Sequence, residues 1–239
     1  MAPTRPPRKV HHILPLPEPR ADLEKSGTPI GPNDLLIAAI ARAHETYKSW
    51  RKTTFAERAA ILKRVAELFR ERREELARLM AVEMGKKLVD GRGEIGLAAE
   101  IFDYYAEEGE RLLAPQKLST REGEGMLINQ PIGVVYGIQP WNFPFYQPTR
   151  FAAPNLMAGN VVLTKHASNV PQCAEAFEQL LFDAGVPQGA YTNLVVSARN
   201  AGIVIDDDRV HLPGLYFFNG RRKMGGVLRH GTTTPFCSF

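Results

Sequence analysis

The chain has 239 residues, of which 44% are apolar, 23% charged and 9% aromatic, a balance typical of globular proteins and not of disordered ones. Two cysteines are too few for a disulfide scaffold, and neither they nor the six histidines have metal-ligand spacing, so we expect no metal and a reducing, cytoplasmic location. The apolar runs are only a few residues long, which argues against a membrane span or a membrane partner.

The basic residues are unevenly distributed. From Arg209 onward the chain holds five of its 30 Lys and Arg residues and no Asp or Glu, which leaves 25 basic and 26 acidic side chains before that point. This nearly neutral body has no basic stripe interleaved with aromatic residues, so we expect no nucleic-acid partner. Residues 209–239 are interpreted as an aberrant basic tail.

The first half of the chain is predicted to be an extended arm followed by helices. Residues 1–33 hold eight of the eighteen prolines, a density that favours an extended arm. From Asp34, apolar residues at steps of three and four predict a helix that ends near Trp50. Thr54 followed by Glu57 is a capping-box pattern that predicts the start of a second helix.

The second helix is expected to run on through the charged residues 70–75, which we interpret as a solvated outer face. Gly85 offers a stop, and a third amphipathic helix is expected beyond it. The predicted core residues of these two helices are Leu62, Val65, Phe69, Leu76 and Leu79, then Ile95, Ala99, Phe102, Ala106 and Leu113.

From about Met126 short apolar runs alternate with helical segments, which is typical of parallel βαβ units. We expect strands at residues 132–138, 160–164 and 191–196, with helices at residues 148–157 and 174–184 between them. The predicted fold class is α/β, an incomplete doubly wound, Rossmann-like sheet preceded by N-terminal helices. Ligands of such sheets bind at the carboxyl ends of the strands, which here are residues 139–145 and 165–168.

Asn142 is the first candidate, because Pro140 and Pro144 fix the backbone on either side of it directly after a strand. Its amide could donate to an oxygen that becomes negative during a reaction. The alternative is a rigid turn in which Trp141 and Phe143 plug the core while Asn142 hydrogen-bonds to local backbone. Residue types alone leave both interpretations open.

Lys165 directly follows the second predicted strand, where a cation could meet a hydroxyl or phosphate of a dinucleotide; the alternative is a solvent-exposed lysine. Gly220 and Gly225 could open a helix whose amides face a pyrophosphate, although two glycines beside basic residues are a weak signal. Neither Cys173 nor Cys237 lies in a setting that suggests a nucleophilic thiolate.

Three segments together resemble one known family. They are WRKTTFAERAAILKRVAELFRERREELARLMAVEMGKKL (residues 50–88), QPIGVVYGIQPWNFPFYQPTRFAAPNLMAGNVVLTKHAS (residues 130–168) and LLFDAGVPQGAYTNLVV (residues 180–196). In this order they resemble the aldehyde dehydrogenase superfamily, with the closest likeness to its NAD(P)-dependent succinate-semialdehyde branch. The resemblance extends over about residues 21–208.

The resemblance implies that a cysteine thiolate attacks an aldehyde substrate, a hydride passes to NAD or NADP, and a Glu-activated water releases the acid. It also implies that Asn142 is the oxyanion donor and that Lys165 binds the adenosine ribose. Ser168 stands where many NAD-preferring members have Glu, so NADP is admissible beside NAD. The resemblance further implies that Ile138, Gln139, Pro140 and Trp141 line the cofactor cleft, and that the family's assembly is a homo-oligomer.

The resemblance weakens beyond Asp208. Gly220 and Gly225 align only loosely with the family's pyrophosphate turn, and the motifs LELGG and GQxC, which carry the family's general base and nucleophile, are not found in this sequence. We therefore expect a C-terminally truncated or frame-disrupted chain: residues 34–208 as a partial NAD(P)-binding domain, with the catalytic domain absent. Two interpretations stay open, an aldehyde-oxidising enzyme and a non-catalytic fragment with residual dinucleotide binding or no stable fold.

Overall fold

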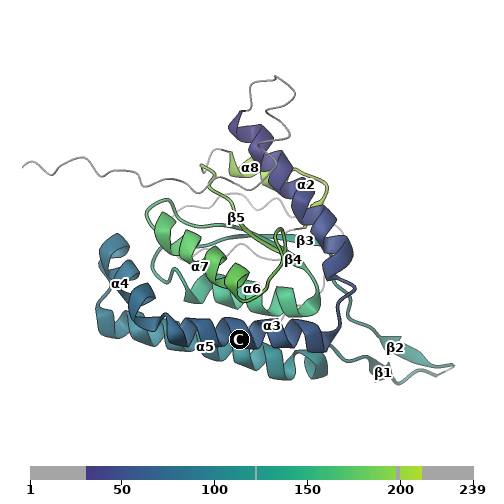
Figure 1. The fold of residues 1–239 in the computed structure, drawn as a ribbon. Helices are drawn as coiled ribbons and strands as arrows, with labels where there is room; N and C mark the ends of the chain where they lie inside the picture. The colour runs from purple at the N-terminus through teal and green to yellow at the C-terminus, as the bar shows by residue number, and fades with distance from the viewer. Residues whose placement is uncertain (1–30, 122, 198–199, 212–239) are drawn as a thin grey trace, which may run out of the picture.

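The computed structural model describes residues 31–121, 123–197 and 200–211. Helices dominate the first half, and parallel strands alternate with helices in the second half (Figure 1). The helices are α2 (Pro32–Trp50), α3 (Phe55–Glu71), α4 (Arg73–Met84), α5 (Leu88–Leu113), α6 (Tyr146–Ala158), α7 (Pro171–Asp183) and α8 (Ala201–Ile205). The strands are β1 (Gln116–Leu118), β2 (Gly125–Leu127), β3 (Val134–Ile138), β4 (Val161–Lys165), β5 (Tyr191–Asn193) and β6 (Val210–His211).

Local sequence signals set several helix ends. The Thr54 hydroxyl accepts from the Glu57 amide at 3.2 Å, and the Glu57 carboxylate accepts from the Thr54 amide at 2.7 Å, so the predicted capping box of α3 is confirmed. Gly85 ends α4 with φ +76°, in the left-handed region that glycine adopts without strain. The predicted stop at Gly85 is therefore also confirmed.

The main sheet has four parallel strands in the order β5-β4-β3-β6. Val134 pairs with Val161 at one end of the central pair of strands, and Ile138 pairs with Lys165 at the other end. The chain moves outward from β3 through α6, β4 and α7 to β5, and then returns to place β6 on the opposite side of β3. This order is that of a doubly wound sheet, as predicted.

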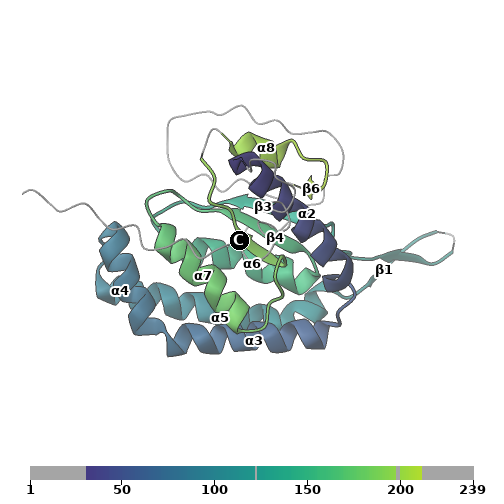
Figure 2. The same cartoon turned by 45° about the horizontal axis from the view of Figure 1, so that its top comes forward.

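The elements form layers, which Figures 1 and 2 show from two directions. α2 and α8 cover one face of the sheet, α6 and α7 cover the other, and α3, α4 and α5 pack against α6 and α7 from outside. Four aromatic side chains join these outer helices to the sheet layer: Phe69, Phe102, Phe145 and Phe177 are fully buried, and their ring centroids lie 5.8 to 6.4 Å apart in contacting pairs. The doubly wound sheet and the N-terminal helices thus share one hydrophobic core.

The structure differs from the sequence expectations in several places. The second predicted helix is broken at Arg72, whose guanidinium pairs with Asp183 at 2.6 Å at the end of α7. The break turns α4 toward α7, so Met80 is fully buried and Leu79 only partly. The α2 helix begins at Pro32, inside the expected arm, and strand β6 extends the sheet beyond the expected boundary at Asp208.

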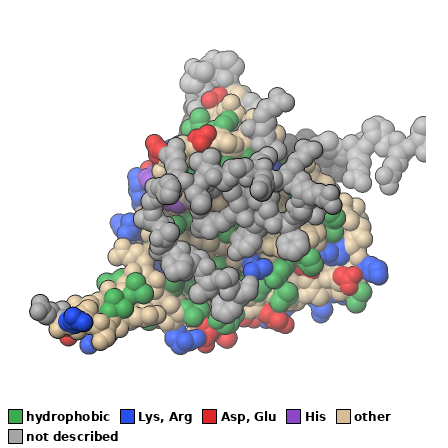
Figure 3. All heavy atoms as spheres, turned by 180° about the vertical axis from the view of Figure 1, so that it is seen from behind, with side chains coloured by type: hydrophobic (Ala, Val, Ile, Leu, Met, Phe, Trp, Pro, Cys, Tyr) green, Lys and Arg blue, Asp and Glu red, His purple; other side chains and the backbone are tan. Residues whose placement is uncertain are grey.

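A β-hairpin that the sequence analysis did not predict joins α5 to β3. Strands β1 and β2 pair antiparallel, and the hairpin projects from the body of the molecule (Figure 1). Its Leu118, Met126 and Leu127 side chains are about half exposed, and Figure 3 shows hydrophobic side chains along the projection. Within the described residues, no helix is both long enough and apolar enough to span a bilayer.

Candidate functional site

The candidate site lies at the carboxyl ends of β3 and β4, next to the point where the strand order reverses between β3 and β6. The segment that follows β3 is joined to the end of β4, because the main-chain amide of Gln139 donates to the Lys165 carbonyl at 2.9 Å. The structure therefore brings the proline-flanked segment of Asn142 and the strand-end Lys165 to the same edge of the sheet. This placement agrees with the sequence prediction, while the ligand roles of the residues stay predictions.

The segment after β3 does not have the packing that a purely structural turn would need. Trp141 is 47% exposed and Phe143 is 41% exposed, so neither ring plugs the core. The Asn142 Oδ1 atom is buried and has no hydrogen-bond partner among the described residues, so this oxygen does not accept from local backbone. The part of the alternative in which Trp141 and Phe143 plug the core is therefore wrong, while the role of the Asn142 side chain stays a prediction.

Gln139, at the start of the same segment, is 2% exposed, and neither polar atom of its side-chain amide has a hydrogen-bond partner in the part of the chain that the structure describes. Ile138 and Pro140 are half-buried on either side of it. A buried amide without partners costs free energy, which proteins tolerate mainly where a functional constraint holds it. The burial of Gln139 could not be predicted from the sequence, because a glutamine directly after a strand is usually an ordinary loop residue.

Lys165 is 8% exposed, so the alternative of a solvent-exposed lysine is wrong. Its ammonium donates to the His166 carbonyl at 3.2 Å and forms no ion pair with any carboxylate among the described residues. Burial lowers the pKa of the Lys165 ammonium. A buried cation without an acidic partner at this edge is suited to an anionic or hydroxyl-bearing ligand, and Ser168, three residues further on, is exposed.

The residues behind Lys165 form a buried hydrogen-bonded cluster. His166 Nε2 lies 3.3 Å from the Tyr191 hydroxyl, and the Thr164 hydroxyl donates to that oxygen at 2.7 Å. Burial, with a smaller effect of the Lys165 charge, lowers the pKa of His166 to about 3. His166 is therefore neutral at physiological pH, and it adds no second cation to the site.

Cys173 lies in the first turn of α7 and is fully buried. Its amide and that of Gln172 each donate to the Glu83 carboxylate at 2.8 Å. Burial raises the pKa of the Cys173 thiol, and its contact with Glu83 raises it further. Cys173 is therefore a protonated structural residue and not a nucleophile. Gly220, Gly225 and Cys237 lie outside the described residues.

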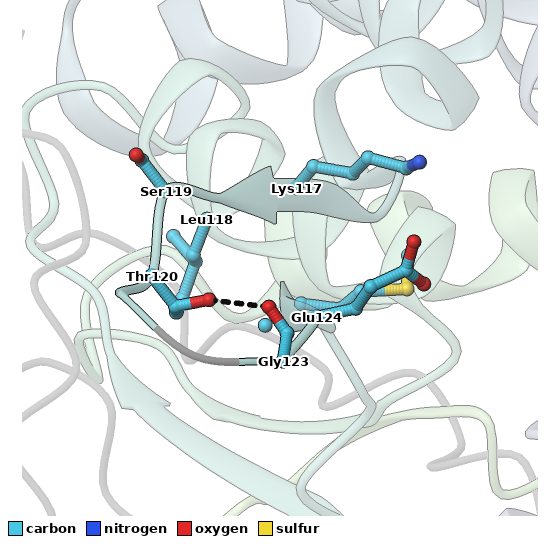
Figure 4. Close-up of a pocket in the computed structure, with 8 residues that line it drawn as sticks. Lys117, Leu118, Ser119, Thr120, Gly123 and Glu124 are labelled. Carbon is cyan, nitrogen blue, oxygen red and sulfur yellow. Dashed lines mark hydrogen bonds between the residues drawn. The ribbon is translucent and has the colours of Figure 1, made fainter.

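A shallow hollow of about 240 Å³ lies elsewhere, between the strands of the β1–β2 hairpin. Figure 4 shows that the turn closes on itself, with the Thr120 hydroxyl donating to the Gly123 carbonyl at 2.7 Å. The hairpin leads into the amino end of β3, whereas Asn142 and Lys165 lie beyond the carboxyl ends of β3 and β4. The hollow is thus not part of the candidate site.

Comparison with known proteins gives a consistent result. Residues 25–215 match the model of the aldehyde dehydrogenase family. The chain is 53% identical over 168 residues to a succinate-semialdehyde dehydrogenase [NADP(+)] of Deinococcus radiodurans, covering 70% of this chain and 35% of the relative. It is 42% identical over 173 residues to a probable succinate-semialdehyde dehydrogenase [NADP(+)] of Synechocystis, covering 72% of this chain and 38% of the relative.

Solved structures agree with these relatives. The crystal structure of succinic semialdehyde dehydrogenase from Streptococcus pyogenes in complex with NADP+ superposes with a TM-score of 0.72 at 40% identity, covering 75% of this chain and 39% of that one. The chain spans 35 to 40% of the length of the curated relatives it matches.

Proposed function

Because this chain belongs to the aldehyde dehydrogenase family, we propose that the residues at the carboxyl ends of β3 and β4 form the NADP-binding part of a catalytic site. That site would oxidise succinate semialdehyde or a similar aliphatic aldehyde to the acid. The observation that carries the proposal is Lys165, a buried cation at the end of β4 that pairs with no carboxylate of the described residues. The identity to NADP-dependent succinate-semialdehyde dehydrogenases supports the choice of cofactor and of aldehyde. The proposal includes a cytoplasmic location and assembly as a homo-oligomer.

The residues present fit an adenosine ribose that carries a 2′-phosphate. The Lys165 ammonium would donate to ribose oxygens, since it has three N–H donors and, among the described residues, donates to the His166 carbonyl at 3.2 Å. The exposed Ser168 hydroxyl brings no negative charge against the 2′-phosphate, and His166 is neutral beside it. Ile138, Gln139, Pro140 and Trp141 would form the wall that the cofactor crosses. When bound, NADP supplies the hydride acceptor.

Asn142 would act on the substrate. Attack on an aldehyde carbonyl turns its neutral oxygen into an oxyanion, and a fixed amide N–H aimed at that oxygen stabilises the developing charge. The Asn142 side chain is suited to this task because it lies beyond the carboxyl end of β3 and its Nδ2 group is a neutral N–H donor; its Oδ1 atom can only accept. Removing one such donor from an oxyanion hole typically costs about 3 kcal/mol of transition-state stabilisation.

A second candidate function is dinucleotide binding without turnover. The specific observation in its favour is that Cys173, the cysteine within the described residues, is buried with a raised thiol pKa. A thioester mechanism needs an accessible thiolate, which Cys173 does not provide. The two candidate functions share the NADP site and differ only in turnover.

The proposal is tested by titrating the purified 239-residue chain with NADP in a calorimeter. We expect saturable binding, and a loss of at least about tenfold in affinity for Lys165→Met, since each tenfold is about 1.4 kcal/mol. Lys117→Met, at an exposed position of the hairpin, is the matched control and should bind like the parent. Absence of NADP binding by the parent, or equal binding by Lys165→Met, would contradict the proposal.

Turnover then separates the two candidates. Formation of NADPH in the presence of succinate semialdehyde, abolished by Cys237→Ala, would support the aldehyde-oxidising function. NADP binding with no NADPH formation would support the binding function.

A further inference from the structure

A buried ion pair lies behind the segment that carries Asn142. Lys86 stands in the turn between α4 and α5, Glu94 lies within α5, and their side chains are only 9% and 1% exposed. The Lys86 ammonium donates to the Glu94 carboxylate. Moving two charges out of water is costly and leaves little net stabilisation unless further hydrogen bonds satisfy both groups. The other hydrogen-bond partners of Lys86 and Glu94 therefore indicate which part of the structure the ion pair stabilises.

Lys86 contacts Asn142 and Phe143 in the segment that follows β3. Its ammonium donates to the main-chain carbonyl of Asn142 at 2.8 Å and lies 4.0 Å from the centroid of the Phe143 ring. The first contact is a charge-assisted hydrogen bond and the second is a cation–π contact, and both act on a partly water-excluded ammonium. Lys86 thus fixes the backbone at the residue whose side chain is the candidate oxyanion donor.

Glu94 holds the end of the same segment. Its Oε1 atom accepts from the Phe145 amide at 2.8 Å and from the Tyr146 amide at 3.0 Å, where α6 begins. Phe145 is the N-cap residue of α6 and has no side-chain oxygen with which to cap the helix, so the carboxylate from α5 does this instead. The negative charge is also favoured there by the helix dipole.

The side chains of the segment do not provide an equivalent anchor at Asn142. Trp141 and Phe143 are about half exposed on either side of it, and Asn142 Oδ1 has no hydrogen-bond partner within the described residues. The described contact that holds Asn142 is made to its main-chain carbonyl, which is the group that Lys86 contacts. A site that stabilises an oxyanion needs its donor held in place before the reaction.

We propose that Lys86 and Glu94 are positioning residues that hold the backbone of Asn142 in one conformation from behind the site. The consequence for catalysis rests on the proposed function, in which Asn142 is the oxyanion donor. The conformational part does not, because it concerns the rigidity of residues 141–143 in the chain as it stands. It is therefore tested without turnover.

The test uses Trp141 as a local reporter. The chain has two tryptophans, so Trp50→Phe leaves Trp141 alone, and Trp50 is a buried core residue whose indole N–H has no partner. In this background Lys86→Met with Glu94→Gln removes both buried charges, while the carbonyl of the introduced glutamine can still accept from the Phe145 and Tyr146 amides. Lys87→Met, at the neighbouring exposed lysine, is the matched control.

We expect the double variant to unfold cooperatively, while the nanosecond depolarisation of Trp141 fluorescence increases at least about twofold in amplitude. The Lys87→Met control should keep the depolarisation of the parent. A double variant that is less stable but leaves Trp141 as rigid as in the parent would overturn the proposal, because the pair would then be merely structural.

A measurement on the unmodified chain covers the case in which the double variant does not fold. Backbone ¹⁵N relaxation should give order parameters of about 0.8 or more for Asn142 and Phe143, as in rigid elements. Values below about 0.6 at these two amides would overturn the proposal. The proposed function fails separately, through absence of NADP binding, whatever the mobility of Trp141.

Discussion

The glutamate at the end of α4 gives the most direct quantitative prediction. Both oxygens of Glu83 accept main-chain amides of the first turn of α7, from Gln172 and Cys173, at 2.8 Å each. The N-cap residue of α7 is Val170, which has no side-chain acceptor. Glu83 therefore caps a helix to which it is not connected in sequence, and Glu83→Ala should leave two amides of a helix N-terminus without partners.

The size of the effect can be worked out from these contacts. A hydrogen bond to a charged group contributes about 1.5 to 3 kcal/mol, whereas the loss of an ordinary N-cap costs about 1 kcal/mol. Glu83 is half-buried, so water replaces part of what is lost. We expect Glu83→Ala to lower the free energy of unfolding by about 3 kcal/mol, and Glu83→Gln, which keeps one acceptor, by about 1 kcal/mol.

The assay is urea unfolding followed by circular dichroism, with amide hydrogen exchange at Gln172 and Cys173 as a local readout. Glu75→Ala is the matched control, because Glu75 lies on the same helix and is exposed. It should change the free energy of unfolding by less than about 0.5 kcal/mol. If Glu83→Ala were no more destabilising than Glu75→Ala, or if exchange at the two amides did not accelerate, the capping argument would be refuted.

Two further predictions concern ionisable groups of α7. Burial raises the pKa of the half-buried Glu178 from an ordinary 4.5 to about 7. The hydrogen bond from the Asn193 amide and the charge of Arg42 lower this pKa, and the charge of Glu175 raises it slightly. The folded chain therefore binds more protons than the unfolded chain between these values, and Glu178 makes stability fall as pH rises through that window. Glu178→Gln should remove this fall in stability. In denaturant titrations it should raise the free energy of unfolding by about 2 kcal/mol at pH 8 and leave it unchanged at pH 4. An equal effect at both pH values would contradict the assignment. In a Cys237→Ala variant, the Cys173 thiol should react with an aromatic disulfide reagent at least about 100-fold more slowly in the folded than in the unfolded chain, since it is buried and protonated; comparable rates would show that the thiol is accessible.

The order of the elements and the edge of the sheet that carries the site could be predicted from sequence. The buried strands are short apolar runs bounded by Gly and Pro, and parallel strands place their carboxyl ends together, so Asn142 and Lys165 were expected at one edge. The β1–β2 hairpin was missed because its strands have three residues each and lie exposed, without the alternation that indicates a half-buried strand. The break at Arg72 has no Gly or Pro to mark it.

The contacts that hold the candidate site could not be predicted, because they join residues far apart in sequence. Lys86 and Glu94 look like surface charges of a polar segment, and only tertiary packing brings them against residues 142–146, about 50 positions further along. The burial of Lys165 was likewise open, since a lysine at a strand end is exposed or buried according to what packs around it. Local patterns set the backbone, whereas burial and pairing of charges depend on the whole fold.

In the proposed function, Lys165 binds NADP beyond the carboxyl ends of β3 and β4, and the uncharged Ser168 leaves the 2′-phosphate without a repelling charge. The most direct measurement compares NADP and NAD affinities of the parent chain with those of Ser168→Glu, with Ser119→Glu on the hairpin as a control for added surface charge. A carboxylate beside the 2′-phosphate should weaken NADP binding at least about tenfold, or about 1.4 kcal/mol, and leave NAD within about threefold. Equal weakening of both cofactors, or none, would contradict the account.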